Sequence, residues 1–150
     1  MTEQTLKQSI QSAVKDAMKG RQKERVAALR LIMSDIKRIE VDERIESDDA
    51  RLLVILDKML KQRRESHAQY ETAGRSDLAQ TEAYEMGVIQ EFLPAALSAE
   101  AIDLIIDKAI AQSGAATVKD MGAVMSLVKP QVQGRADMSA VSRQIKQRLA

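Results

Sequence analysis

Residues 117–137 read TVKDMGAVMSLVKPQVQGRAD, a stretch that contains the signals for the start and the end of a helix. Thr117 and Asp120 resemble a capping box, in which a hydroxyl accepts from a backbone N–H and a carboxylate reaches back to another. Pro130 and Gly134 predict the end of that helix. Its apolar stripe is Met121, Val124, Met125 and Val128. The stretch therefore predicts one amphipathic helix followed by a turn.

Helix signals continue on both sides of this stretch. Ser98 can cap a preceding helix, which Ser113 and Gly114 would end, and Asp137 can cap a following one. The apolar seam of the last helix would be Met138, Val141, Ile145 and Leu149. The end of the chain therefore predicts a unit of three helices.

Four more amphipathic segments precede Pro94. Thr2 can cap the first, either Ser47 or Asp48 can cap the third, and Ser76 can cap the fourth. Proline disfavours the α conformation in the residue before it, so Pro94 predicts the end of the fourth segment. The expected domains are an N-terminal helical bundle over residues 1–94 and a small three-helix domain over residues 95–150.

Composition supports an all-α fold. Charged residues make up 30% of the chain and aromatic residues only 2%, a mixture that favours helices over sheets. Cysteine is absent, which excludes disulfides and thiolate chemistry. No segment approaches the roughly 20 apolar residues of a membrane helix, and the polar start TEQTLKQS has no apolar signal region. We therefore expect a cytoplasmic protein that does not bind a membrane.

Few residues could do covalent chemistry. His67 is the only histidine, and its neighbour Ser66 would point about 100° away from it on a helix, so the two cannot form a nucleophile and base pair. With no cysteine, a zinc site would have only carboxylates beside this one imidazole, an unusual set of ligands for that metal. No phosphate loop, calcium loop or dinucleotide motif is present. We expect no catalytic residues, no metal and no cofactor.

Charge predicts a partner only locally. Lys and Arg number 23 against 22 Asp and Glu, so the net charge of +1 does not indicate a polyanion partner. Arg63, Arg64 and Arg75 form a possible second basic face, which could contact phosphate or could be a solvated helix face paired with nearby acids.

The turn in residues 129–137 also allows two interpretations. Gly134 can adopt a left-handed conformation from which Arg135 projects beside a helix N-terminus, an arrangement suited to phosphate. A purely structural turn is the other interpretation, since Asp137 would repel a phosphate. Arg143 and Lys146 lie three residues apart, opposite the apolar seam of their helix, so both could face a ligand.

Three blocks carry a resemblance that covers nearly the whole chain: LRLIMSDIKRIEVDER at 29–44, KQRRESHAQYETAGRSDLAQTEAYEMGVIQEFLP at 61–94, and VKDMGAVMSLVKPQVQGRAD at 118–137. In this order they closely resemble the YqeY family of small bacterial proteins. The resemblance implies an N-terminal helical bundle joined to a domain similar to the tail of GatB, the tRNA-binding subunit of the glutamine-dependent amidotransferase. In that enzyme the tail contacts tRNA, and the catalytic parts lie elsewhere.

The resemblance implies a function in which the chain contacts tRNA without catalysis of its own. The family label of carbon–nitrogen ligase with glutamine as amido-N-donor would then belong to a complex. Family members commonly have lysines where this chain has Gln131 and Gln133, so its basic turn is weaker. The expected tRNA-binding residues are Lys119, Lys129, Gly134, Arg135, Arg143 and Lys146.

We therefore expect a non-catalytic accessory protein of translation that contacts the tRNA backbone, with no DNA partner. The alternative is a protein-interaction module that docks an aminoacyl-tRNA synthetase or an amidotransferase. A free-standing enzyme is the third hypothesis.

Overall fold

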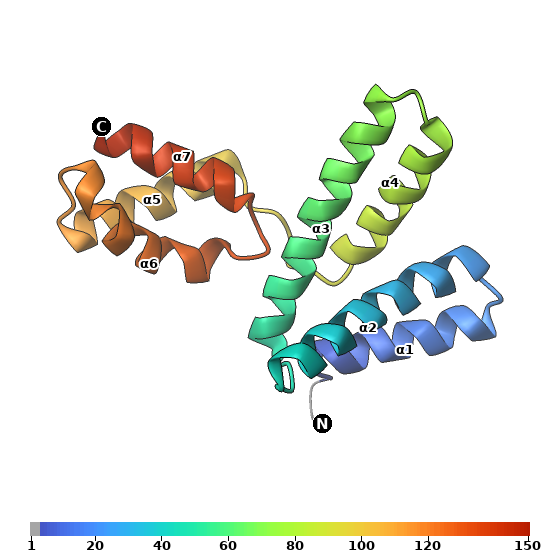
Figure 1. Cartoon of the computed structure of the whole chain (residues 1–150). Helices are drawn as coiled ribbons and strands as arrows, with labels where there is room; N and C mark the ends of the chain where they lie inside the picture. Colours follow the sequence, from blue (N-terminus) through green and yellow to red (C-terminus); the bar gives the residue numbers. More distant parts are fainter. Residues whose placement is uncertain (1–3) are drawn as a thin grey trace. The chain divides into compact units, whose positions relative to one another are not determined.

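The protein is described here by a computed structural model that covers residues 4–150, and these residues form seven α-helices, one short 3-10 helix and no strand. The all-α expectation is confirmed. The elements are α1 (Leu6–Lys19), α2 (Lys23–Glu43), α3 (Asp49–Thr72), α4 (Ser76–Gln90), α5 (Ala99–Ser113), η1 (Val118–Asp120), α6 (Met121–Val132) and α7 (Met138–Leu149) (Figure 1).

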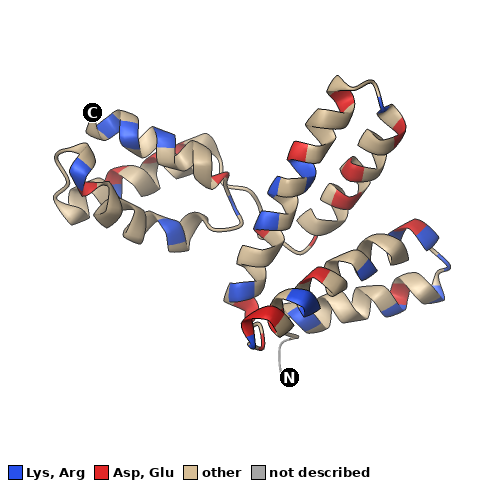
Figure 2. Cartoon of the chain, in the orientation of Figure 1, with Lys and Arg blue, Asp and Glu red and all other residues tan. Residues whose placement is uncertain are grey.

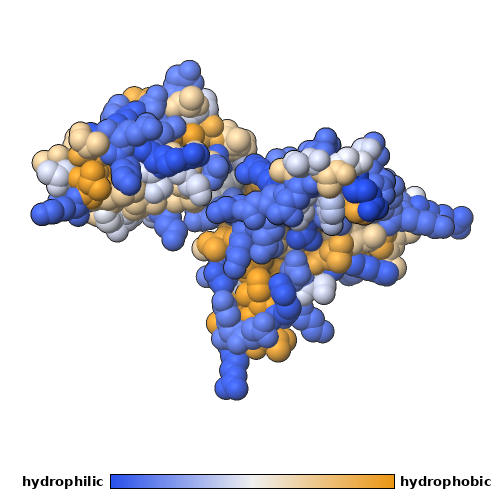
Figure 3. Space-filling model, turned by 45° about the horizontal axis from the view of Figure 1, so that its top comes forward, coloured by the Kyte–Doolittle hydropathy of each residue, from blue (hydrophilic) through white to orange (hydrophobic). Residues whose placement is uncertain are grey.

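The helices group into two compact units, an N-terminal unit that ends at Leu93 and a C-terminal unit that begins at Pro94. Each unit has its own hydrophobic core. Of the helices in residues 4–150, not one combines the length and the apolar character needed to span a membrane. One face of the molecule is mostly hydrophilic, with apolar areas on both units (Figure 3).

The N-terminal unit consists of two helical hairpins. α1 packs against α2 and α3 packs against α4, while α2 also contacts α4 and α1 also contacts α3 (Figure 1). Apolar residues of all four helices meet in one core, so the spacing seen in the sequence produces one buried face per helix. Its largest fully buried side chains are Ile10, Leu29, Ile32, Ile36, Leu52, Leu56 and Ile89.

Caps define the helix starts in this unit. Thr5 caps α1 in a capping box with Gln8, with N–O distances of 3.2 and 3.0 Å; Thr2 lies outside the described residues. Asp48 caps α3 by accepting from the backbone N–H of Arg51 at 2.8 Å. The prediction that Ser76 caps α4 is wrong, because Ser76 is the first helical residue and the cap position makes no side-chain hydrogen bond.

In the C-terminal unit, α6 packs against both α5 and α7. Ser98 caps α5 and Asp137 caps α7, as the sequence predicts, and Thr117 with Asp120 forms the capping box before α6. α6 does not break at Pro130, contrary to the prediction, and continues to Val132. The core of this unit is Ile106, Ala109, Val124, Val128, Val132, Val141, Ile145 and Leu149.

Candidate nucleic-acid interface

The connection between α6 and α7 is a tight hydrogen-bonded turn. The carbonyl of Val132 accepts from the backbone N–H groups of Arg135 at 2.8 Å and Ala136 at 3.1 Å. Gly134 is buried and has a φ of +75°, a conformation that glycine adopts without steric cost. Asp137 accepts from the N–H of Ser139 at 3.0 Å and so caps α7. Gly134 and Asp137 therefore shape the turn.

Arg135 connects this turn to the segment that leads into α5. Its Nε donates to the carbonyl of Ala95 at 3.2 Å, and its own carbonyl accepts from the N–H of Leu97 at 2.9 Å. The side chain is half-buried. The guanidinium thus has an internal acceptor, although an arginine carries five N–H donors and uses only one in this contact.

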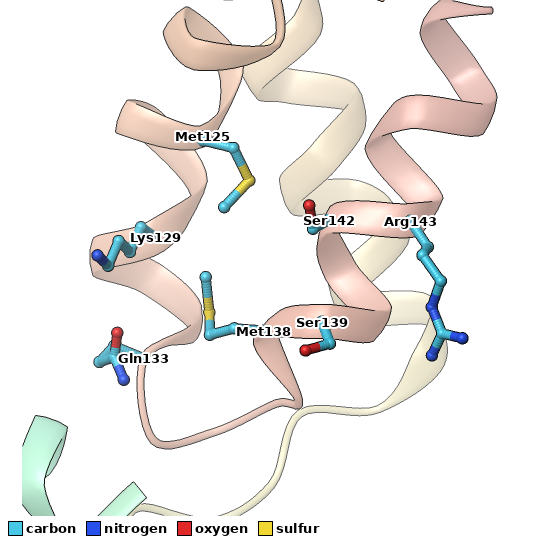
Figure 4. Close-up of a pocket in the computed structure, with 7 residues that line it drawn as sticks. All are labelled: Met125, Lys129, Gln133, Met138, Ser139, Ser142 and Arg143. Carbon is cyan, nitrogen blue, oxygen red and sulfur yellow. The ribbon is translucent and has the colours of Figure 1, made fainter. Parts of the chain in front are cut away.

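A hollow of about 770 Å³ opens between α6 and α7. Figure 4 shows two methionine side chains, Met125 and Met138, in the space between the helices, with Lys129 to one side of them and Arg143 to the other. The other lining residues are Gln133, Ser139 and Ser142. The hollow has an apolar floor, two hydroxyls and two cations, and its lining includes no Asp or Glu from residues 4–150.

The cations of α7 fall into two groups. Arg148 forms ion pairs with Asp103 at 2.7 Å and with Asp107, so it joins α7 to α5. Arg143 and Lys146 are exposed, whereas Ile145 between them is buried. Arg143 and Lys146, like Lys129, make no ion pair with any described residue.

Two acids near these helices are engaged locally. Backbone N–H groups of Ala116 and Thr117 donate to Asp120, and these bonds lower the pKa of that carboxyl. Asp137 is engaged at the start of α7. With Asp103 and Asp107 paired to Arg148, four of the acids in this unit have internal partners. Positive charge is therefore left on α6 and α7, where Figure 2 marks Lys and Arg.

Lys119 lies in η1, at the opposite end of α6 from Lys129. At about 1.5 Å rise per helical residue, the two lysines are roughly 15 Å apart along the axis. Lys119 does not line the hollow. The structure thus places Lys129 and Arg143 around one hollow with Lys146 further along α7, while Lys119, Gly134 and Arg135 lie elsewhere in the unit.

The possible second basic face has a different environment. Arg63 on α3 pairs with Glu85 on α4 at 3.1 Å, and the two side chains are only 17% and 15% exposed. Arg75 pairs with Asp77 at 3.3 Å. Arg64 is exposed and, among the described residues, has no ion pair. Two of these three arginines thus have acidic partners within the N-terminal unit.

A polar cluster surrounds Arg63 between α3 and α4. Burial, followed by the negative charge of Glu85, raises the pKa of Glu82, while Arg63 and His67 act in the opposite direction. His67 also lies 3.7 Å from Glu71. Among residues 4–150, no group of three or more acidic or histidine side chains is placed to hold a metal ion.

Sequence reasoning missed the lining of the hollow. Met125 and Met138 have the helical spacing of core residues, and the sequence assigns both to buried seams. Both are only partly buried, whereas Val124 and Val128 beside Met125 on α6 are fully buried. No sequence signal separates a methionine at the edge of a core from one inside it, because periodicity gives the face and not the depth.

Comparison with known proteins identifies the family. The family model described as "Yqey-like protein" matches residues 7–149. A protein of Schizosaccharomyces pombe named "Uncharacterized protein C22F3.15" is 31% identical over 85 residues, which are 57% of this chain and 69% of that one.

A second relative is the "Altered inheritance of mitochondria protein 41, mitochondrial" of Meyerozyma guilliermondii. It is 33% identical over 98 residues, and the match covers 63% of this chain and about half (51%) of the relative. The family match extends over both helical units and includes the α6–α7 turn and the hollow. The chain therefore belongs to the YqeY family.

Proposed function

We propose that this protein is a non-catalytic accessory factor that contacts the tRNA backbone through α6 and α7 of its C-terminal unit. The observation that carries the proposal is the set of outward cations Lys129, Arg143 and Lys146, which have no ion pair among the described residues. Two of them flank a hollow that is lined by no carboxylate of the described part of the chain. A polyanion is the ligand class that such a surface attracts.

The number of cations sets the expected strength. Each phosphate that a Lys or Arg neutralises releases counterions, so binding weakens as salt rises. Three cations give modest affinity and a shallow salt dependence. The family resemblance implies that this unit is similar to the tail of a tRNA-binding amidotransferase subunit, and this expectation supports tRNA as the polyanion. The proposed place of the chain in translation, as an accessory of aminoacyl-tRNA amidation, has the same basis.

The proposal divides the candidate residues by role. Lys129, Arg143 and Lys146 contact phosphates, while Arg135 and Gly134 hold the turn that positions α7 against α6. Lys119 contributes only if the RNA extends along the whole of α6. This division differs from a single cluster around Arg135, because that guanidinium already donates to Ala95.

The test measures binding of bulk tRNA to the full chain by mobility shift at several salt concentrations. The triple variant Lys129→Ala, Arg143→Ala, Lys146→Ala should bind roughly 10 to 100-fold more weakly at low salt. The magnitude of its log–log salt slope should fall by about 2 to 3, because each of the three lost contacts removes about 0.7 to 0.9.

The matched control is Lys37→Ala, Lys58→Ala, Lys61→Ala, which removes the same charge from exposed positions of the N-terminal unit. It should bind tRNA as the unchanged protein does. Equal weakening in both triple variants would mean that net charge alone drives binding and would reject the site. Unchanged binding in the first variant would reject it as well.

A further inference from the structure

We infer that the hollow between α6 and α7 receives the base of one unpaired RNA nucleotide, with the flanking phosphates held by Lys129 and Arg143. This inference rests on the proposed RNA contact and names the part of the RNA that is recognised. It predicts a preference for loops and bulges over continuous duplex.

The apolar floor is the first reason. Phosphates alone need no methionines, yet Met125 and Met138 lie partly exposed between the two cations (Figure 4). Methionine is flexible and polarisable, and it makes favourable contacts with ring edges and faces. The side chains follow the order cation, apolar floor, cation. A nucleotide base with a phosphate on each side has the matching order of negative charge, flat ring and negative charge.

The polar edge of the hollow is the second reason. Ser139 and Ser142 line it, and neither hydroxyl makes a hydrogen bond with another described residue. A hydroxyl both donates and accepts, so it can serve either kind of group on the edge of a base. An acidic peptide could also satisfy the cations and pair its backbone with the serines, so it is tested below as the competing occupant.

Access is the third reason. Bases in a duplex are stacked and paired, and sequence-specific RNA recognition mostly uses unpaired bases that turn outward. The depression between the two helices is wide and open to solvent, so a protruding group can enter it. The hollow of about 770 Å³ is open enough to admit one. A surface meant only for duplex phosphates would need no such depression.

The experiment compares two RNA probes with the full chain, a hairpin with an unpaired loop and a blunt duplex with the same stem. A fluorescent adenine analogue in the loop reports the environment of the base. We expect tighter binding of the hairpin and a fluorescence change on binding. Met125→Ala should weaken hairpin binding roughly fivefold to tenfold, the loss expected from removing part of a buried apolar side chain, and leave duplex binding unchanged.

Three variants make this measurement specific. Met121→Ala is the matched control, since Met121 is a partly buried methionine of the same helix that does not line the hollow. Met125→Leu keeps the floor apolar and should restore hairpin binding. Ser139→Asp places a negative charge in the hollow at an exposed position in the first turn of α7, where an acid suits the helix dipole, so it tests the site without weakening the fold.

The outcomes separate this inference from the proposed function. Equal binding of hairpin and duplex, both weakened by loss of Lys129 and Arg143, overturns the base site and leaves the phosphate contact. Absence of RNA binding at any salt overturns both. A third outcome is that a peptide of glutamate and apolar residues binds in a way that depends on Met125, while hairpin binding is unchanged by substitution of Met125 or Ser139. This outcome also overturns the inference and assigns the hollow to a protein partner.

Discussion

The N-terminal and C-terminal units use their arginines differently. Arg63 lies between α3 and α4 with its charge matched by Glu85, and both side chains are mostly buried. Arg143 on α7 is exposed beside a hollow and has no acidic partner among the described residues. The first arrangement holds two helices together, and the second leaves charge for a ligand. Burial and pairing, not residue type, thus separate a structural cation from a candidate binding cation.

The largest effect is expected from breaking the paired arginine. Arg63→Ala leaves Glu85 and the nearby Glu82 without the guanidinium, so the free energy of unfolding should fall by about 1–3 kcal/mol, below the ~3–5 kcal/mol of a fully buried pair. Arg64→Ala, one residue away but exposed, should change it by no more than about 0.5 kcal/mol. Urea unfolding measures both, and equal losses would contradict the distinction.

A second internal network involves Glu40. Its carboxylate accepts from the N–H of Ser47 at 2.7 Å and from the ammonium of Lys7 at 3.0 Å, and these contacts, the first above all, lower the pKa of Glu40. Glu40→Gln should lower the free energy of unfolding by about 1 to 2 kcal/mol at pH 7, the range for hydrogen bonds to charged groups.

The sign of the pH dependence follows from the lowered pKa. The contribution of Glu40 is present above the ordinary value of 4.5 and is lost as pH falls through the folded value, so the difference between the variant and the unchanged protein should shrink below about pH 4.5. Exposed Glu46 serves as the control in Glu46→Gln. A difference that is constant from pH 7 to pH 3 would show that the charge of Glu40 is not involved.

The C-terminal unit has its own internal arginine in Arg135. Arg135→Ala removes the hydrogen bond to the Ala95 carbonyl and should lower stability by about 0.5–1.5 kcal/mol. Hydrogen exchange should become faster in the C-terminal unit, including at the amide of Leu97. If Arg143→Ala produced the same acceleration, the contrast between the inner and the outer arginine of this unit would fail.

Glu82 should show a smaller effect of the opposite sign to Glu40. Its pKa is raised by burial and by Glu85, so ionisation is disfavoured in the folded state and its contribution to stability is lost as pH rises through the folded value. Glu82→Gln should therefore stabilise the protein at pH 7, by less than about 1 kcal/mol, and the gain should vanish below the ordinary pKa of 4.5. If the variant were instead less stable at pH 7, the Glu82 carboxylate would have a stabilising partner in the folded protein.

The smallest effect on stability is expected at the proposed interface. The double variant Lys129→Ala, Arg143→Ala loses two exposed cations that have no ion pair among the described residues. Its thermal unfolding midpoint should therefore shift by no more than corresponds to about 0.5 kcal/mol of unfolding free energy. RNA binding by the same variant should weaken. A large loss of stability would show that these cations belong to the fold in the way that Arg63 does.

Sequence reasoning was accurate for several helix starts, where the cause is local, although it placed the cap of α4 wrongly at Ser76. The caps Ser98 and Asp137 and the capping box of Thr117 with Asp120 were predicted, because each bond joins atoms only a few residues apart. Pro130 was misjudged for a tertiary reason. Val128 and Val132 on either side of it are both fully buried, and their packing maintains the helix across the one backbone bond that proline removes.

The candidate site was less accessible to sequence reasoning. The sequence grouped Arg135 with Arg143 as candidate binding cations and assigned Met125 and Met138 to apolar seams, not to a site. Distances such as that from Arg135 to Ala95, 40 residues away, depend on how the segment before α5 lies along the α6–α7 turn. Such long-range contacts leave no periodic signal.

By itself the sequence determined the all-α class, the number of helices, most helix ends and the family. These follow from hydrophobic period, capping chemistry and residue order, which act over a few residues or over the whole family pattern. Only the tertiary structure decided which charges are neutralised and which remain outward, because pairing depends on helix faces brought together by the two cores. The charges that remained outward, and the hollow between them, are where we place the function.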